Sequence, residues 1–205
     1  MPAVATLVLR VWLPDRPGAL GAVASRIGAV RGDVIGIDII ERGAGRAVDE
    51  LVVALPDEGL VDLLLAEVRH VEGVDVEDVR VLDGPPENPT VVALEMAAAL
   101  RPGDGTEDRL PLVVAGARQL LHADWAAVVD LAGGGVVLSD GDGLPGEGWL
   151  TAFVHGALTD GGPADLQELA VARIGNDGPA LVVGRESVPL RASEHQVLTL
   201  IAQLA

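Results

Sequence analysis

The 205-residue sequence predicts an α+β protein with two domains. In the first half, apolar runs typical of strands and helices follow the order strand, helix, two strands, helix, strand. A stretch of prolines, glycine and acids at residues 84–89 then reads as a semi-stiff linker. Beyond it lies a second apolar block with helices at both ends. We therefore expect a first domain over residues 1–83 and a second over residues 90–205.

The first domain contains four segments typical of strands, at residues 5–12, 33–40, 47–55 and 74–82. Apolar spacing predicts helices over 18–30 and from Pro56 to about Gly73. Glu77 and Asp78 interrupt the last strand, which predicts a bulge. A βαββαβ order packs as an antiparallel sheet with both helices on one face, the ferredoxin-like arrangement. Because the second strand is apolar on both faces, we expect the uncovered face to pair with another copy or with the second half of the chain.

The second domain is predicted to contain two hairpins between helices. Helices are expected over 90–100, from Thr106, over 148–158 and from Ser193, which would form a capping box with Gln196. The hairpins pair WAAVVDL with GVVLS, and ELAVARI with PALVVGR. We expect one antiparallel sheet with the terminal helices on one side.

Composition excludes several partners and locations. The chain has 31 acidic residues against 14 arginines and a net charge of −17, which would repel a phosphate backbone. We therefore expect no nucleic-acid partner. No stretch approaches the roughly 18 apolar residues of a membrane span, and residues 1–12 do not resemble a signal peptide. The sequence predicts a cytoplasmic protein without a membrane partner.

The sequence contains neither cysteine nor lysine, which excludes much catalytic chemistry. Without cysteine there is no disulfide, thiolate nucleophile or zinc ribbon. Without lysine there is no Walker A loop and no pyridoxal phosphate linkage. No serine lies in a G-x-S-x-G elbow, the four histidines are scattered, and Asp140 and Asp142 lack the third acid of a calcium loop. We expect no enzyme activity, no cofactor and no metal site.

The segment LPDRPGAL, residues 13–20, joins the first predicted strand to the first helix. If Pro17 occupies an early helical position, the N–H groups of Gly18, Ala19 and Leu20 are left unsatisfied and attract an anion such as a carboxylate. Asp15 lies just upstream and could take the ammonium of the same small molecule. The alternative is a plain Asp-Arg-Pro-Gly turn.

Residues 5–82 resemble the ACT domain, a regulatory module that binds amino acids, through PDRPGAL, GDVIGIDII and the βαββαβ order. The resemblance implies a ligand between two such domains, held by the loop before the first helix and the neighbour's second strand. The implied ligand-binding residues are Asp15, Arg16, Pro17, Gly18, Ala19, Leu20, Gly36, Ile37 and Asp38. Many members have asparagine where Gly36 stands, so a side-chain hydrogen bond is missing here. The alternative for Asp38 is that its carboxylate faces solvent at a sheet edge or pairs with an arginine. Arg16 is expected to be a solvated loop residue.

Residues 106–205 resemble a GAF domain, a small-molecule sensory module. The resemblance is carried by ALVVGRESVPLRASEHQVLTLIAQLA and by the alternation of helices with hairpins. The segment between the hairpins is short for that family. We therefore expect a degenerate pocket and a dimerising or partner-binding role.

Three functional hypotheses follow. The leading one is a regulatory, non-catalytic homodimer that senses a free amino acid and acts on a partner enzyme or regulator. The second is an adaptor dimer in which both modules have lost their ligands. The third is a carboxylate-based enzyme of amino-acid metabolism, for which no acid pair is singled out by position.

Overall fold

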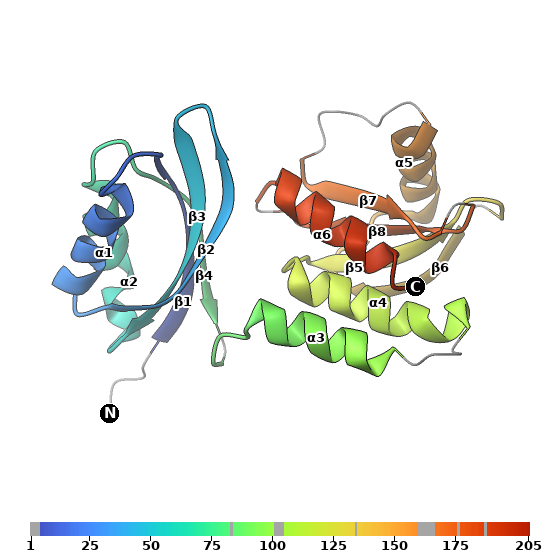
Figure 1. Cartoon of the computed structure of the whole chain (residues 1–205), viewed down its shortest axis with the longest axis horizontal. Coiled ribbons are helices and arrows are strands. Elements are labelled where there is room, and N and C mark those ends of the chain that lie inside the picture. Colours follow the sequence, from blue (N-terminus) through green and yellow to red (C-terminus); the bar gives the residue numbers. More distant parts are fainter. Residues whose placement is uncertain are drawn as a thin grey trace. The chain divides into compact units, whose positions relative to one another are not determined.

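The computed structural model describes residues 5–82, 84–100, 105–133, 135–159, 167–175, 177–186 and 188–205, apart from the side chain of Thr106. The chain divides into two compact units, Met1–Pro86 and Glu87–Ala205 (Figure 1). We call them unit 1 and unit 2 and describe each by itself. No helix among these residues is long and apolar enough to span a bilayer.

Unit 1 is a four-stranded antiparallel sheet with both helices on one face. Its elements are β1 (Ala5–Pro14), α1 (Ala19–Ala29), β2 (Asp33–Gly43), β3 (Arg46–Leu55), a 3-10 turn (Glu58–Leu60), α2 (Val61–Arg69) and β4 (Asp75–Leu82). The strand order is β2-β3-β1-β4, with every neighbouring pair antiparallel. The βαββαβ order and this sheet confirm the ferredoxin-like prediction for the first domain.

The unit 1 core lies between the sheet and its helices. Alternate residues of the central strand β1, such as Leu7 and Leu9, pack with Val23 of α1 and Leu64 of α2. The expected bulge in β4 is confirmed, because Arg10 and Val11 of β1 are in register with Asp78 and Val76, so the register skips the β4 residue between those two.

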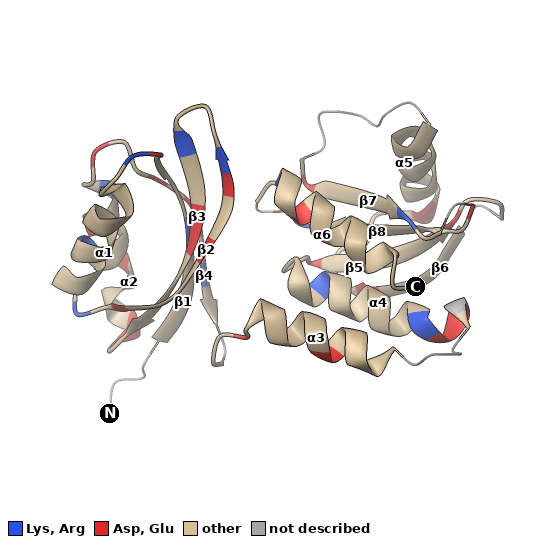
Figure 2. Cartoon of the chain, viewed as in Figure 1, with Lys and Arg blue, Asp and Glu red and all other residues tan. Residues whose placement is uncertain are grey.

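The face of this sheet opposite the helices carries a charged row. Arg10 of β1 is in register with Glu50 of β3 and Asp78 of β4, and its Nε donates to Glu50 Oε1 at 2.8 Å. Asp38 of β2 is the register partner of Glu50 on the other side. Figure 2 shows the charged segments on β2 and β3. The sequence suggested an apolar face, but this row of charged residues crosses it.

Unit 2 is a second antiparallel sheet, in the order β6-β5-β8-β7, built from two hairpins. Its elements are α3 (Pro89–Ala99), α4 (Thr106–Leu120), β5 (Trp125–Asp130), β6 (Gly135–Gly141), α5 (Glu147–Thr159), β7 (Leu169–Arg173), β8 (Ala180–Gly184) and α6 (Ala192–Ala202). One buried cluster joins α3, α4 and α6 to one face of the sheet, and another joins α5 to the opposite face. The single sheet with terminal helices on one side is confirmed. Its element order differs from that of unit 1.

The start of α6 differs from the predicted capping box. The helix begins at Ala192, and the Glu194 carboxylate accepts the Arg191 N–H at 2.8 Å. Glu194 is held there because Arg185, only 3 % exposed, donates to both of its oxygens at 3.0 and 3.2 Å. The prediction of a capping box between Ser193 and Gln196 is therefore wrong. The buried ion pair with Arg185 holds Glu194 at the helix start, and the cap lies at Arg191 instead.

Candidate functional site

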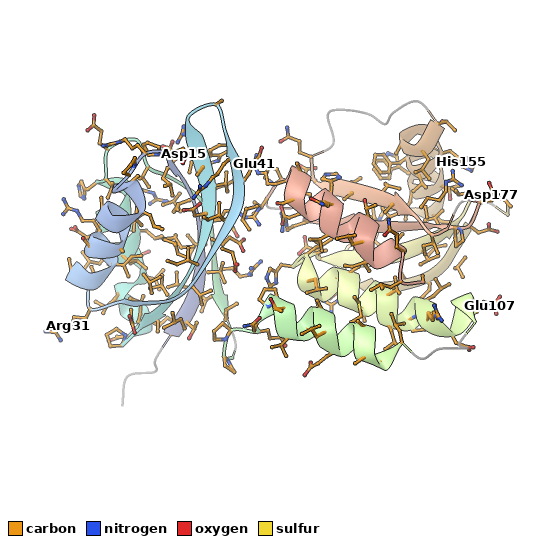
Figure 3. All side chains as sticks on the ribbon, viewed as in Figure 1. Asp15, Arg31, Glu41, Glu107, His155 and Asp177 are labelled. Atoms are coloured by element: carbon orange, nitrogen blue, oxygen red, sulfur yellow. The ribbon has the colours of Figure 1, made fainter. Side chains whose placement is uncertain are left out.

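The connection between β1 and α1 is anchored at one end of the unit 1 sheet. β1 ends at Pro14, and the Asp15 N–H donates to the carbonyl of Gly45 in the β2–β3 turn at 2.9 Å. Figure 3 shows Asp15 at the end of the sheet where Glu41 of β2 also lies, and Arg31 at the opposite end. The first turn of α1 therefore begins beside the β2–β3 turn.

Gly18 sets the start of α1. Its φ of +88° lies in the left-handed region that favours glycine, and no side chain caps the helix. This geometry brings the Arg16 carbonyl back to accept the Ala19 N–H at 3.2 Å. The prediction that Ala19 offers a free donor is therefore wrong, as is the helical position given to Pro17, which precedes the cap.

Three main-chain donors at this end remain open. The N–H groups of Gly18, Leu20 and Gly21 have no partner among the residues that the structure describes. The Ala22 N–H, by contrast, donates to the Gly18 carbonyl at 2.9 Å and starts the helical ladder. Open donors at a helix N-terminus carry partial positive charge, so the arrangement suits an anion such as a carboxylate.

A solvent-open pocket of about 370 Å³ adjoins the start of α1. Its lining residues are Arg16, Pro17, Gly18, Ala19, Ala22, Arg26, His70, Val71 and Glu72. Arg26 donates to Glu67 of α2 at 3.0 Å, which joins the two helices. The sequence did not indicate the three residues that follow α2, because only the fold brings them beside α1. The pocket combines cationic groups for an anion with one carboxylate for an amine.

The expected residues of β2 lie apart from this pocket. Gly36 and Asp38 are in register with Val52 and Glu50, on the helix-free face, whereas Ile37 faces the helix side. Within one chain the structure does not bring Gly36 or Asp38 to the α1 terminus. A Cβ at Gly36 would lie 3.0 Å from Val52 Cγ2, so an asparagine there would require that side chain to move.

Asp49 of β3 is a buried carboxylate that the sequence analysis missed. It is the register partner of Val11 and Ile39, and Val11 packs in the core beneath α1, so Asp49 points toward the helix-covered side. The residue is 3 % exposed, and its Oδ1 has no hydrogen-bond partner among the described residues. The sequence did contain a signal for it, because Asp49 is an acid at an inward-facing position of an otherwise apolar strand.

Burial raises the pKa of Asp49 above its ordinary value. The charge of Arg42 acts in the opposite direction, and the charge of Asp15 adds to the rise. The three residues belong to one end of the sheet, because Arg42 is in register with Ala47 and the Asp15 N–H is bonded to Gly45. A carboxyl with a raised pKa destabilises the fold while it is ionised.

We expect Asp49→Asn to stabilise unit 1 at neutral pH by up to about 1 kcal/mol, because it removes an ionised group that has no hydrogen bond. The folded pKa lies above the unfolded value, so the wild type is penalised at higher pH and relieved as pH falls through the folded pKa. Thermal unfolding at several pH values should therefore show a gap between variant and wild type that narrows toward acid pH. A gap independent of pH would contradict this cause.

Unit 2 also has a solvent-open pocket, which is larger than the pocket beside α1. A pocket of about 630 Å³ lies between the β7–β8 turn and the end of α6, where Arg173 and Gln203 are among its lining residues. Among the described residues, no group of three or more acidic or histidine side chains is placed to hold a metal ion. The groups best arranged for a small ligand therefore lie at the start of α1.

Comparison with known proteins gives structural likenesses only. No protein-family model matches the chain, and no curated protein matches it. The ACT domain of GTP pyrophosphokinase from Chlorobium tepidum is similar to 42 % of this chain and 92 % of its own, with 17 % identity and a TM-score of 0.31.

Two further structures match nearly the whole chain. A protein of unknown function from Galdieria sulphuraria covers 97 % of this chain and 89 % of its own, with 12 % identity and a TM-score of 0.36. A candidate transcriptional repressor of the glycine cleavage system covers 97 % and 90 %, with 10 % identity and a TM-score of 0.31. None of the three is described as a GAF domain. At these scores the fold rests on the strand order given above.

Proposed function

We propose that this chain is a non-catalytic regulatory protein that responds to a free amino acid bound at the start of α1. The observation that carries the proposal is the set of open N–H groups at Gly18, Leu20 and Gly21 beside a pocket lined by Arg16 and Glu72. Main-chain donors and a guanidinium suit the ligand carboxylate, and nearby carboxylates suit its ammonium. The proposal rests on this chemistry and not on the likeness to ACT domains.

The proposed working form is a homodimer. β2 is an edge strand whose exposed isoleucines, Ile35, Ile37 and Ile39, are each about half-exposed, at 48, 47 and 49 %. An exposed apolar edge strand is prone to pair with another chain. In such a pair, Gly36, Ile37 and Asp38 of one copy would complete the site at Asp15–Leu20 of the other. Ligand would then favour one quaternary state by its differential affinity.

Replacing Gly21 tests the role of the main-chain donors. Proline at this first-turn position deletes one open N–H at a helical position that tolerates it, and a Cβ there meets no atom within 4 Å. Gly21→Ala keeps the N–H and serves as the matched control. By calorimetry against the twenty amino acids, we expect the wild type and Gly21→Ala to bind one of them and Gly21→Pro to bind it about tenfold more weakly. Equal binding by all three would contradict the proposal.

The second candidate is an adaptor dimer without a ligand. It is favoured by the crowding at Gly36, where Val52 would have to move to admit the side chain that many ACT domains use, and by the openness of the pocket at α1. In this case unit 2 would serve as a dimerising surface. A dimer in size-exclusion chromatography whose melting temperature does not respond to any amino acid would favour the adaptor.

A further inference from the structure

We propose that Asp49 accepts the ligand's ammonium group, so that the site at the start of α1 selects molecules that carry a cationic amine together with a carboxylate. The inference rests on the proposed function, because it assigns the second charged group of the same ligand. It replaces Asp15 as the principal acceptor and leaves Asp15 as a neighbouring charge.

The fold itself gives no reason for an acid at Asp49. The residue is 3 % exposed, its Oδ1 is without a hydrogen-bond donor among the described residues, and its register partners Val11 and Ile39 are apolar. A buried polar atom without a partner is costly, and native structures keep few of them. An incoming ammonium group would supply the missing donor and the opposite charge.

Its place in the fold joins Asp49 to the open donors. Val11, the register partner of Asp49 on β1, packs in one core with Ala19 and Val23 of α1. Asp15, in the connection that leads into α1, acts on Asp49 electrostatically. Asp49 thus belongs to the end of the sheet where α1 begins, because β1 ends three residues after Val11 and Asp15 is then bonded to Gly45. A free amino acid carries a carboxylate and an ammonium one carbon apart.

Arg42 of β2 is the charged residue that competes with such a ligand. The charges acting on Asp49 come from Arg42 and Asp15, which leaves one uncompensated negative charge among the three residues. Arg42 is exposed, so its guanidinium can move away at little cost. Removing Arg42 should therefore strengthen amine binding, whereas removing Asp49 should weaken it.

Glu72 is the alternative acceptor, since it lines the pocket beside α1. It is exposed, and an ion pair in contact with water contributes little because solvent screens it. Asp49 is withdrawn from water, where a charge pair is much stronger. Substituting Glu72 and Asp49 one at a time therefore shows which of them binds the ammonium.

The test measures selectivity for the amine. The full chain is titrated calorimetrically with each of the twenty amino acids and then with the deaminated carboxylic acid that corresponds to the tightest binder. We expect the wild type to prefer the amino acid by at least about tenfold. Asp49→Asn should abolish this preference without weakening the binding of the deaminated acid. Arg42→Gln should increase the preference, and Glu72→Gln should alter it less than about twofold.

The outcomes separate this inference from the function on which it rests. A wild type that binds none of the twenty amino acids overturns the proposed function and this assignment together. A wild type that binds one, with Asp49→Asn retaining the full preference, overturns only the assignment of Asp49. If Glu72→Gln alone removes the preference, the ammonium lies in the pocket beside α2 and Asp49 is not its acceptor. Circular dichroism of each variant verifies that the fold is retained.

Discussion

Replacing Arg185 by leucine is expected to lower the free energy of unfolding of unit 2 by about 3–5 kcal/mol. Arg185 is 3 % exposed and donates to the carbonyls of Leu121, Val188 and Pro189 at 2.9, 3.0 and 2.8 Å, as well as to Glu194. The variant leaves a buried carboxylate without its counter-ion and three carbonyls without their donor. Urea denaturation followed through Trp125, which is buried in unit 2, measures the change.

The matched control is Arg118→Leu. Arg118 and Asp140 also form an ion pair in unit 2, at 2.6 Å, but their side chains are 41 and 42 % exposed. Water screens such a pair, so the loss should stay within about 1 kcal/mol. Similar losses in the two variants would mean that burial does not set the strength of the Arg185 pair.

The second large effect is expected at Leu64 of α2. Leu64 is completely buried in the unit 1 core, so Leu64→Ala should cost about 2–5 kcal/mol through lost apolar burial and the cavity left behind. The neighbouring Leu63 is 49 % exposed on the same helix. Leu63→Ala should change stability by less than about 1 kcal/mol. Urea denaturation of the two variants side by side makes the comparison, and equal losses would show that α2 is not packed as described.

The architecture of unit 1 was predictable because its elements carry their own periodicity. β1 shows alternating apolar residues, and in α1 the buried positions Ala19, Val23 and Ile27 recur every four residues. Even the bulge in β4 is visible in the sequence, because the apolar alternation changes phase there. Patterns of this kind are local, so the type and order of the elements could be predicted, and the βαββαβ order was enough to predict the sheet.

The candidate site was predictable only in part. The open donors at Gly18 and Leu20 follow from a helix that begins after a glycine, whereas the bond from Ala19 to Arg16 depends on the exact turn of the chain at Gly18. His70 and Glu72 come from a distant segment that tertiary packing brings to α1. The placement of Gly36, Ile37 and Asp38 in a ligand site remains a prediction, since it needs a second copy of the chain.

The helix start at Gly18 has a consequence for how this protein can change over evolutionary time. Its open donors belong to the peptide backbone, so nearly every residue type at positions 20 and 21 supplies them equally, and only proline would delete one. Side chains around this turn can therefore change in related sequences without removing the N–H groups that the proposed function assigns to a carboxylate. Under the proposed function, such changes would alter the contacts to the other end of the ligand, and with them the choice of amino acid.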